Sequence, residues 1–98
     1  MQPEHGKILD TILRKHFTGP VTVYAFGSRV TGKAKKFSDL DLAIDMGQAM
    51  SLKIMAMLAS DFEESALPYK VDIIDWNTID SAFRQHISAD CMVIYRGH

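Results

Sequence analysis

Cysteine is almost absent from this sequence: Cys91 is the only one among 98 residues. A single cysteine cannot form a disulfide within the chain and cannot supply the paired thiolates of a zinc site. The four histidines are scattered, without the close spacing of two metal ligands on one element. We therefore predict no zinc site, and we expect a cytoplasmic protein, because unpaired cysteine is typical of a reducing compartment.

The sequence also lacks an excess of charge of one sign and any long hydrophobic run. Its 11 lysines and arginines nearly balance 12 aspartates and glutamates, which leaves a formal net charge of −1. Without a basic excess, direct binding to nucleic acid is not expected. No apolar run approaches the roughly 18 residues of a membrane-spanning helix, and the N-terminus lacks the basic and apolar regions of an export signal. We expect no association with a membrane.

The length and composition predict one small globular domain over residues 1–98. Hydrophobic residues make up 47% of the sequence and charged residues 23%, both near the averages of soluble globular proteins. A chain of this size buries roughly two-thirds of its unfolded surface. We therefore expect the functional site to be a surface groove or to be shared with a partner.

Hydrophobic periodicity divides the chain into helices and strands. Spacings of three and four predict helices over 4–17, between Ser51 and Pro68, and from an Asn77 or Thr78 cap to about Ser88. β-branched runs and alternation predict strands over 21–26, 39–45 and 71–76. The apolar segment 91–95 suits a strand or a helical end equally. This order of elements predicts an α+β fold, a small mixed β-sheet covered by helices on at least one face.

Two aspartates, Asp39 and Asp41, lie two residues apart in the predicted strand 39–45. Residues two apart in a strand point to the same side, so these carboxylates face away from Leu40 and Leu42. Like charges this close repel each other, and a hard divalent cation such as Mg²⁺, which prefers oxygen ligands, relieves the repulsion. The pair indicates a metal site; a solvated strand face is the alternative, since carboxylates are mostly exposed.

A glycine-serine turn, Gly27-Ser28, follows the predicted strand 21–26 and precedes Arg29. Backbone N–H groups at such a turn can bind phosphate oxygens, because glycine permits a close approach and serine adds a hydroxyl. Arg29 is a candidate phosphate contact at the same place. An ordinary turn with a solvated arginine is the alternative.

The order of these features resembles a known family. Gly27-Ser28-Arg29, followed by Gly32 and then by Ser38-Asp39-Leu40-Asp41, is similar to the motif of the polymerase-beta-like nucleotidyltransferase superfamily. The stretch 23–45 resembles the minimal nucleotidyltransferases, which are small stand-alone versions of its catalytic domain. That family has a third carboxylate in a later strand. Val71-Asp72-Ile73 matches its hydrophobic-Asp-hydrophobic pattern, and Asp75 is the alternative position.

The resemblance implies a site for ATP and two Mg²⁺ ions. Asp39 and Asp41 would be ligands to both ions, and Asp72 would complete the acceptor-side ion and take the proton of the attacking hydroxyl. Gly27 and Ser28 would contact the β- and γ-phosphates, and Arg29 would contact a phosphate or the leaving group.

The same resemblance implies transfer of a nucleoside monophosphate, AMP from ATP, to a hydroxyl, with release of pyrophosphate. Minimal nucleotidyltransferases are commonly paired with a HEPN-type toxin, which they neutralise by modifying a tyrosine, so the role that the resemblance implies is that of an antitoxin. Two alternatives stay open: a non-catalytic binding module that inhibits its partner by occlusion, and transfer to a small molecule such as an aminoglycoside. The sequence also leaves homo-oligomerisation open.

Overall fold

The computed structural model describes residues 3–27 and 39–97 of the chain. In chain order, its elements are α1 (Pro3–His16), β1 (Val21–Phe26), β2 (Leu40–Asp45), α3 (Leu52–Glu63), β3 (Val71–Asp75), α4 (Ser81–Ala89) and β4 (Met92–Gly97). The four strands form one mixed sheet in the order β3-β2-β1-β4. The predicted α+β fold is therefore confirmed.

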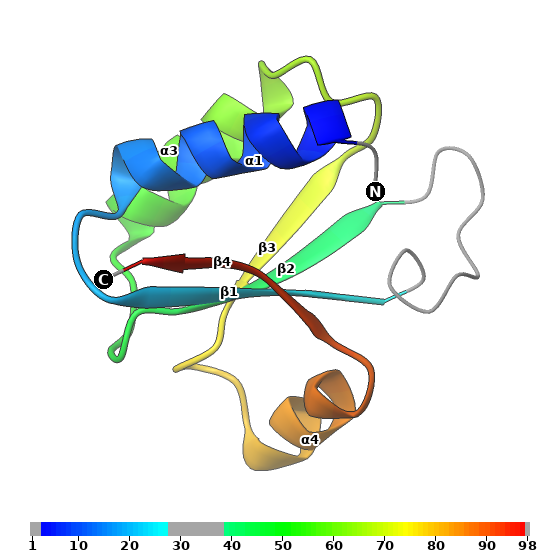
Figure 1. The fold of residues 1–98 in the computed structure, drawn as a ribbon. Coiled ribbons are helices and arrows are strands. Elements are labelled where there is room, and N and C mark those ends of the chain that lie inside the picture. The colour runs from blue at the N-terminus through cyan, green and yellow to red at the C-terminus, as the bar shows by residue number, and fades with distance from the viewer. Residues whose placement is uncertain (1–2, 28–38, 98) are drawn as a thin grey trace.

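Helices cover both faces of this sheet. β1 is antiparallel to β2 and to β4, whereas β2 and β3 are parallel. α1 and α3 lie together on one face, and α4 lies on the other (Figure 1). α3 provides the crossover between β2 and β3, which parallel strands require because the end of β2 and the start of β3 lie at opposite ends of the strands. This crossover sets β3 beside β2 and brings distant parts of the sequence into register.

The core lies between the sheet and the layer formed by α1 and α3. Alternate residues of β1 and β2 point into it, as the period of a strand requires. The core side chains with no exposed surface include Leu13, Val23, Ala25, Leu40, Leu42, Ile44 and Leu58. Burial of each leucine or isoleucine stabilises the fold by about 1.5–3 kcal/mol. The intervening residues of both strands face the α4 side, outside this core.

The helix caps were predicted correctly for α3 and wrongly for α4. Ser51 caps α3, and its Oγ accepts a hydrogen bond from Ile54 N at 3.1 Å. The cap of α4 is Asp80, whose carboxylate accepts from Phe83 N at 2.7 Å. The expected caps, Asn77 and Thr78, instead close a turn after β3, because the side chain and carbonyl of Asp75 accept their hydrogen bonds.

The ambiguous segment near the C-terminus is a strand. β4 pairs antiparallel with β1, with Thr22 opposite Arg96 and Val23 opposite Tyr95. The register shifts between Val23 and Tyr24, and Met92 at the start of β4 stays 48% exposed. Partial exposure on both faces explains why the hydrophobic pattern of this segment has no clear period. Pairing with β1 determines its structure.

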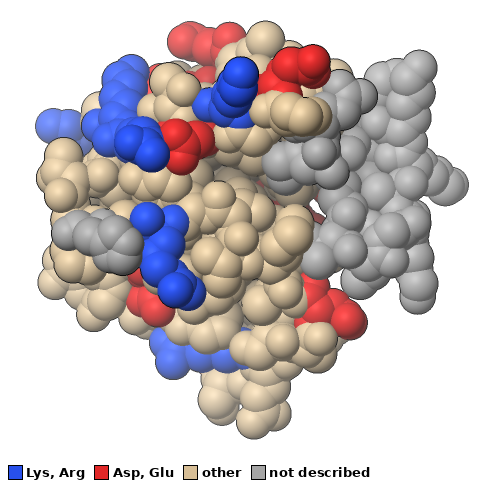
Figure 2. All heavy atoms as spheres, viewed as in Figure 1, with Lys and Arg blue, Asp and Glu red and all other residues tan. Residues whose placement is uncertain are grey.

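The described surface mixes both signs of charge. On the face shown in Figure 2, Lys and Arg side chains lie among Asp and Glu side chains. This distribution agrees with the net charge of −1. Each helix within residues 3–27 and 39–97 is too short or too polar to cross a membrane.

Candidate active site

Asp41 and Asp72 lie directly opposite each other on the parallel strands β2 and β3. Paired residues on neighbouring strands point to the same face of a sheet. Leu40 and Leu42, on either side of Asp41, are fully buried in the core, so Asp41 points to the opposite face. Asp39 precedes β2 by one residue, two positions before Asp41, and is exposed. The predicted carboxylates therefore lie on the α4 face, at the end of the sheet where β2 and β3 begin.

The charges of these residues affect one another. Partial burial raises the pKa of the Asp41 carboxyl above its ordinary value, and the negative charges of Asp72 and Asp39 raise this pKa further. A raised pKa means that the ionised Asp41 is unfavourable in its surroundings. A bound cation offsets that penalty, so Asp41 is suited to hold a metal ion.

Gly27 lies against the same carboxylate. The last residue of β1, Phe26, pairs with Asp41, and Gly27 follows it with a φ of +86°. A Cβ atom at this position would be 2.5 Å from Asp41 Oδ2. Glycine is therefore required at position 27 for two reasons: the backbone is left-handed, and a side chain would enter the space that the carboxylate occupies. The other two predicted phosphate contacts, Ser28 and Arg29, lie outside the described residues.

Lys70 is a neighbour of the site that the sequence interpretation missed. Its Nζ lies 3.4 Å from Asp72 Oδ1, and the two side chains are 72% and 42% exposed. Residues two apart on a strand share a face, so the Lys-x-Asp spacing was the available signal. An exposed ion pair of this kind contributes little to stability. Its effect is local: it places a cation beside Asp72.

Two other aspartates near the site have structural roles. The buried Asp75 points to the core side of β3, where Oδ2 accepts from Met50 N at 2.7 Å and Oδ1 from Asn77 N at 3.0 Å. Asp45 accepts from Gly47 N at 2.9 Å and from the amide of Asn77 at 3.0 Å. Asp75 alternates with Asp72 along β3 and faces away from Asp41. It is therefore not the third carboxylate of the site.

The donors fit Mg²⁺ bound together with a nucleotide. In residues 3–27 and 39–97, no three carboxylate, imidazole or thiolate groups are gathered closely enough to form a protein cage for a metal ion. Mg²⁺ usually keeps several waters and is held by one or two carboxylates plus substrate phosphates. Asp41 and Asp72, with Asp39 beside them, supply carboxylates of the required kind on one face. These residues would hold the ion jointly with a triphosphate.

Aromatic side chains lie farther along the strands from these carboxylates, near the end of β3. The rings of Tyr24 and Trp76 have centroids 5.4 Å apart, and the guanidinium of Arg84 from α4 lies 5.4 Å from the Trp76 ring. Arg84 Nε also donates a hydrogen bond to the Trp76 carbonyl at 3.0 Å. Trp76 therefore serves to attach α4 to the sheet.

Comparison with known sequences gives one family and two curated relatives. The model of the family described as polymerase beta, nucleotidyltransferase matches residues 7–97. A probable protein adenylyltransferase MntA of Haemophilus influenzae is 44% identical over 94 residues, covering 96% of this chain and 82% of the relative. A putative protein adenylyltransferase of Methanocaldococcus jannaschii is 32% identical over 76 residues, covering 78% of each chain.

Solved structures with the same fold include toxin–antitoxin complexes. One, with AMP-PNP, matches with a TM-score of 0.77 and 24% identity, covering 99% of this chain and 75% of the other. Another contains a tri-AMPylated HEPN toxin of Shewanella oneidensis with an MNT antitoxin. It matches with a TM-score of 0.73 and 21% identity, covering 100% and 74% of the two chains. At this level of identity, the likeness is one of fold.

Proposed function

This chain belongs to the polymerase beta nucleotidyltransferase family, and on that premise we propose that it is a Mg²⁺-dependent protein adenylyltransferase that acts as the antitoxin of a HEPN-type toxin. The 44% identical relative is named as a protein adenylyltransferase, which favours a protein acceptor over a small molecule such as an aminoglycoside. The toxin–antitoxin complexes of the same fold support a HEPN-type partner. The acceptor group is a hydroxyl, which we assign to a tyrosine of that partner.

The reaction exchanges one phosphorus–oxygen bond for another. The acceptor oxygen forms a bond to the α-phosphorus of ATP, the bond from that phosphorus to the α,β-bridging oxygen breaks, and pyrophosphate leaves with the electron pair. The proton of the acceptor hydroxyl passes to Asp72. When bound, two Mg²⁺ ions supply charge stabilisation to the attacking and leaving oxygens.

Each carboxylate has a separate task in this scheme. Asp39 and Asp41 would hold the metal ions, and a bound cation would offset the burial and the neighbouring negative charges that raise the pKa of Asp41. Asp72, opposite Asp41 on β3, orients the acceptor hydroxyl and receives its proton. Gly27 leaves the space that the Asp41 carboxylate occupies. Ser28 and Arg29 contact the phosphates of the nucleotide. The observation on which this proposal rests is the register that sets Asp41 opposite Asp72.

Transfer of label from α-labelled ATP to a purified HEPN-type partner tests the proposal. We expect Mg²⁺-dependent labelling of the partner by the native chain, and none by the double variant Asp39→Asn, Asp41→Asn. Asp72→Asn is expected to abolish labelling while nucleotide binding persists, because Asp39 and Asp41 remain. If the double variant moves no label and still neutralises the partner fully, inhibition is by occlusion and the proposal is wrong.

A further inference from the structure

A groove runs along the open side of β3, between this strand and α3. Its volume is about 870 Å³, and its wall on the helix side is mostly apolar: Leu52, Met55, Ala56, Ala59 and Phe62, with Glu63 at the end of α3. Its other wall is the segment 67–73, which includes Lys70 and Asp72. The groove therefore begins among apolar side chains and reaches the residue that we assign to the acceptor side of the reaction.

The outer edge of β3 offers backbone hydrogen bonds to an occupant of this groove. Leu40 N donates to Lys70 O at 2.9 Å, and Trp76 N donates to Ile44 O at 3.0 Å. Backbone groups of successive strand residues alternate between the two edges, so the even-numbered residues of β3 bond to β2. The N–H and C=O groups of Val71 and Ile73 consequently point outward.

No other described strand pairs with this edge. β3 is the terminal strand of the sheet as resolved over residues 3–27 and 39–97. An open edge is a template for a further strand unless it is covered. Beyond Ile73, the Asp75 carbonyl already accepts a hydrogen bond within the chain, from Thr78 N at 3.1 Å. The available edge is therefore short and is centred on Asp72.

We propose that an extended segment of the acceptor protein adds to this edge as a fifth strand, with its hydroxyl-bearing residue directly opposite Asp72. This proposal rests on the proposed function, since it assigns the segment that the transferase modifies. Strand addition of this kind takes its affinity from backbone hydrogen bonds and its specificity from the pockets that receive alternate side chains.

The alternation of side chains specifies the sequence of that segment. The residue opposite Asp72 points to the face where Asp41 and Asp72 lie, and directly opposite side chains have Cβ atoms about 4.5–5.5 Å apart. Its two neighbours point to the other side, toward α3, where Val71 and Ile73 pack against the core. The segment is thus predicted to have a hydroxyl residue, tyrosine in our scheme, flanked on both sides by apolar residues.

A segment of the acceptor suits this edge better than a second copy of the same chain. A second copy bound here would cover Asp72 and block the reaction. The groove is lined by two acids, Glu63 and Asp72, and by Lys70, which is paired with Asp72, so it has little net charge and does not select a strongly charged occupant. Leu52, 86% exposed on its rim, provides apolar contact for an incoming side chain.

Amide exchange of the full chain tests the proposal without nucleotide or metal. The probe is the blocked peptide Lys-Thr-Val-Tyr-Val-Thr-Lys, and its control has aspartate in place of both valines. At about millimolar peptide, we expect slower exchange of the Val71 and Ile73 amides, with no change in α1. No slowing at these two amides, or equal slowing with the control peptide, overturns the proposal.

A variant of the groove wall tests the same idea in the transfer reaction. Ala56→Trp places a large ring in the groove from an exposed position of α3. We expect at least a tenfold rise in KM for the protein acceptor, with unchanged binding of ATP. The control Met57→Trp alters a 45% exposed residue of the same helix that does not line the groove, and it is expected to leave KM unchanged.

The outcomes separate the two proposals. If the native chain transfers no label to any partner, the proposed function is wrong, whatever the peptide does. If the native chain transfers label and Ala56→Trp does so with the native KM, the proposed transferase activity is retained and the proposed strand addition at β3 is wrong. If purified chain self-associates and peptide does not compete with self-association, the edge binds a second copy and the proposal is wrong.

Discussion

A Cβ atom added to Gly27 would lie 2.5 Å from Oδ2 of Asp41. This relationship ties the turn after β1 to the central carboxylate of the site. We expect Gly27→Ala to lower the rate of transfer by about a hundredfold, because misplacement of a reacting group by about 1 Å has an effect of this size. The far-ultraviolet circular dichroism should stay native, since the substitution lies at the end of a strand.

Gly47 provides a matched control for this substitution. Its φ of +82° is close to that of Gly27, but nothing lies within 4 Å of a Cβ placed there. Gly47→Ala and Gly27→Ala should therefore share the cost of the left-handed backbone, about 1–2 kcal/mol of unfolding free energy each, and Gly27→Ala should in addition displace the Asp41 carboxylate. Only Gly27→Ala should lose transfer. Equal activity of the two variants would show that Gly27 serves the backbone alone.

Asp72 and Asp75, three residues apart, should respond to amidation in opposite ways. Asp72→Asn is expected to abolish transfer and to leave stability nearly unchanged, because its side chain is 42% exposed. Asp75→Asn should reduce stability by about 1–3 kcal/mol, since an amide has one acceptor oxygen for the two N–H groups of Met50 and Asn77. Urea unfolding and label transfer measured on both variants check this.

The specific activity of the Asp75 variant decides whether its role is structural. Corrected for the folded fraction, Asp75→Asn should transfer label at the native rate. Loss of activity without loss of stability would place Asp75 in the reaction and would contradict its assignment to the core side of β3.

The fold could be predicted from the sequence wherever one face of an element is buried. β1 and β2 alternate between core and α4 side, so their period is clear in the sequence. β4 is partly exposed on both faces, and its pairing with β1 is a long-range contact that no local pattern contains. The α4 cap was misplaced because Asn77 and Thr78 are good capping residues that a competing turn uses first.

The sequence predicted which residues form the candidate site, but it did not predict how they are arranged in space. The spacing of Asp39 and Asp41 places both on one side of a strand from first principles. Their approach to Asp72 depends on the parallel register of β2 and β3, which the sequence alone does not determine. The family resemblance selected Asp72 over Asp75. The structure adds the physical reason, which is that the two residues lie on opposite faces of β3.

The charge on Asp41 should destabilise the fold at neutral pH. Its folded pKa is raised above the ordinary 3.8, so the penalty is fully present above the folded pKa and disappears as the pH falls toward 3.8. We expect Asp41→Asn to be more stable than the native chain at pH 7 and to lose this advantage near pH 4. Urea midpoints measured across that range check the direction.

Mg²⁺ should offset the same penalty on the Asp41 charge in the native chain. An ion that binds only the folded state stabilises it by about 2.7 kcal/mol at a hundredfold excess over its Kd. With a non-hydrolysable ATP analogue present, Mg²⁺ should raise the melting temperature of the native chain and have less effect on Asp41→Asn. An equal rise in both proteins would remove Asp41 from the metal site.

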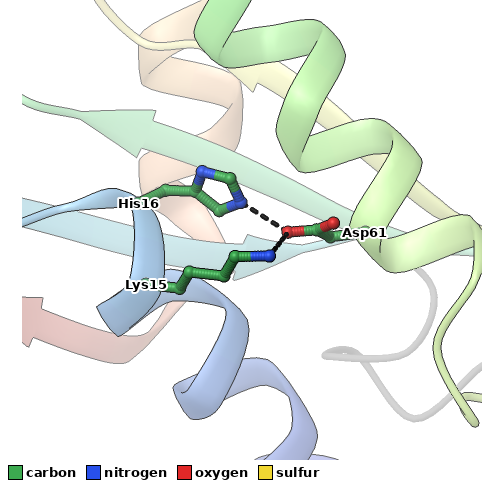
Figure 3. A network of polar contacts seen from close by, with 3 residues as sticks. All are labelled: Lys15, His16 and Asp61. Carbon is green, nitrogen blue, oxygen red and sulfur yellow. Dashed lines mark hydrogen bonds and ion pairs between the residues drawn. The ribbon is translucent and has the colours of Figure 1, made fainter.

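Asp61 should show the opposite dependence on pH. Its Oδ2 lies 2.5 Å from His16 Nε2 and 3.3 Å from Lys15 Nζ, joining α3 to the end of α1 (Figure 3). The hydrogen bond from His16 lowers the pKa of Asp61 below its ordinary 3.8, and Lys15 adds to this. A lowered folded pKa contributes stability above pH 3.8, and that contribution is lost as the pH falls through the folded pKa.

The variant Asp61→Asn isolates this contribution. At pH 7 it should unfold at lower urea than the native chain. The difference should shrink as the pH falls below about 4 and through the lowered folded pKa, where the native carboxylate also becomes neutral. Asp10→Asn is the control, because Asp10 forms an exposed pair with Arg14 within α1, and such pairs contribute little. A difference that persists unchanged at low pH would mean that Asp61 acts through packing rather than charge.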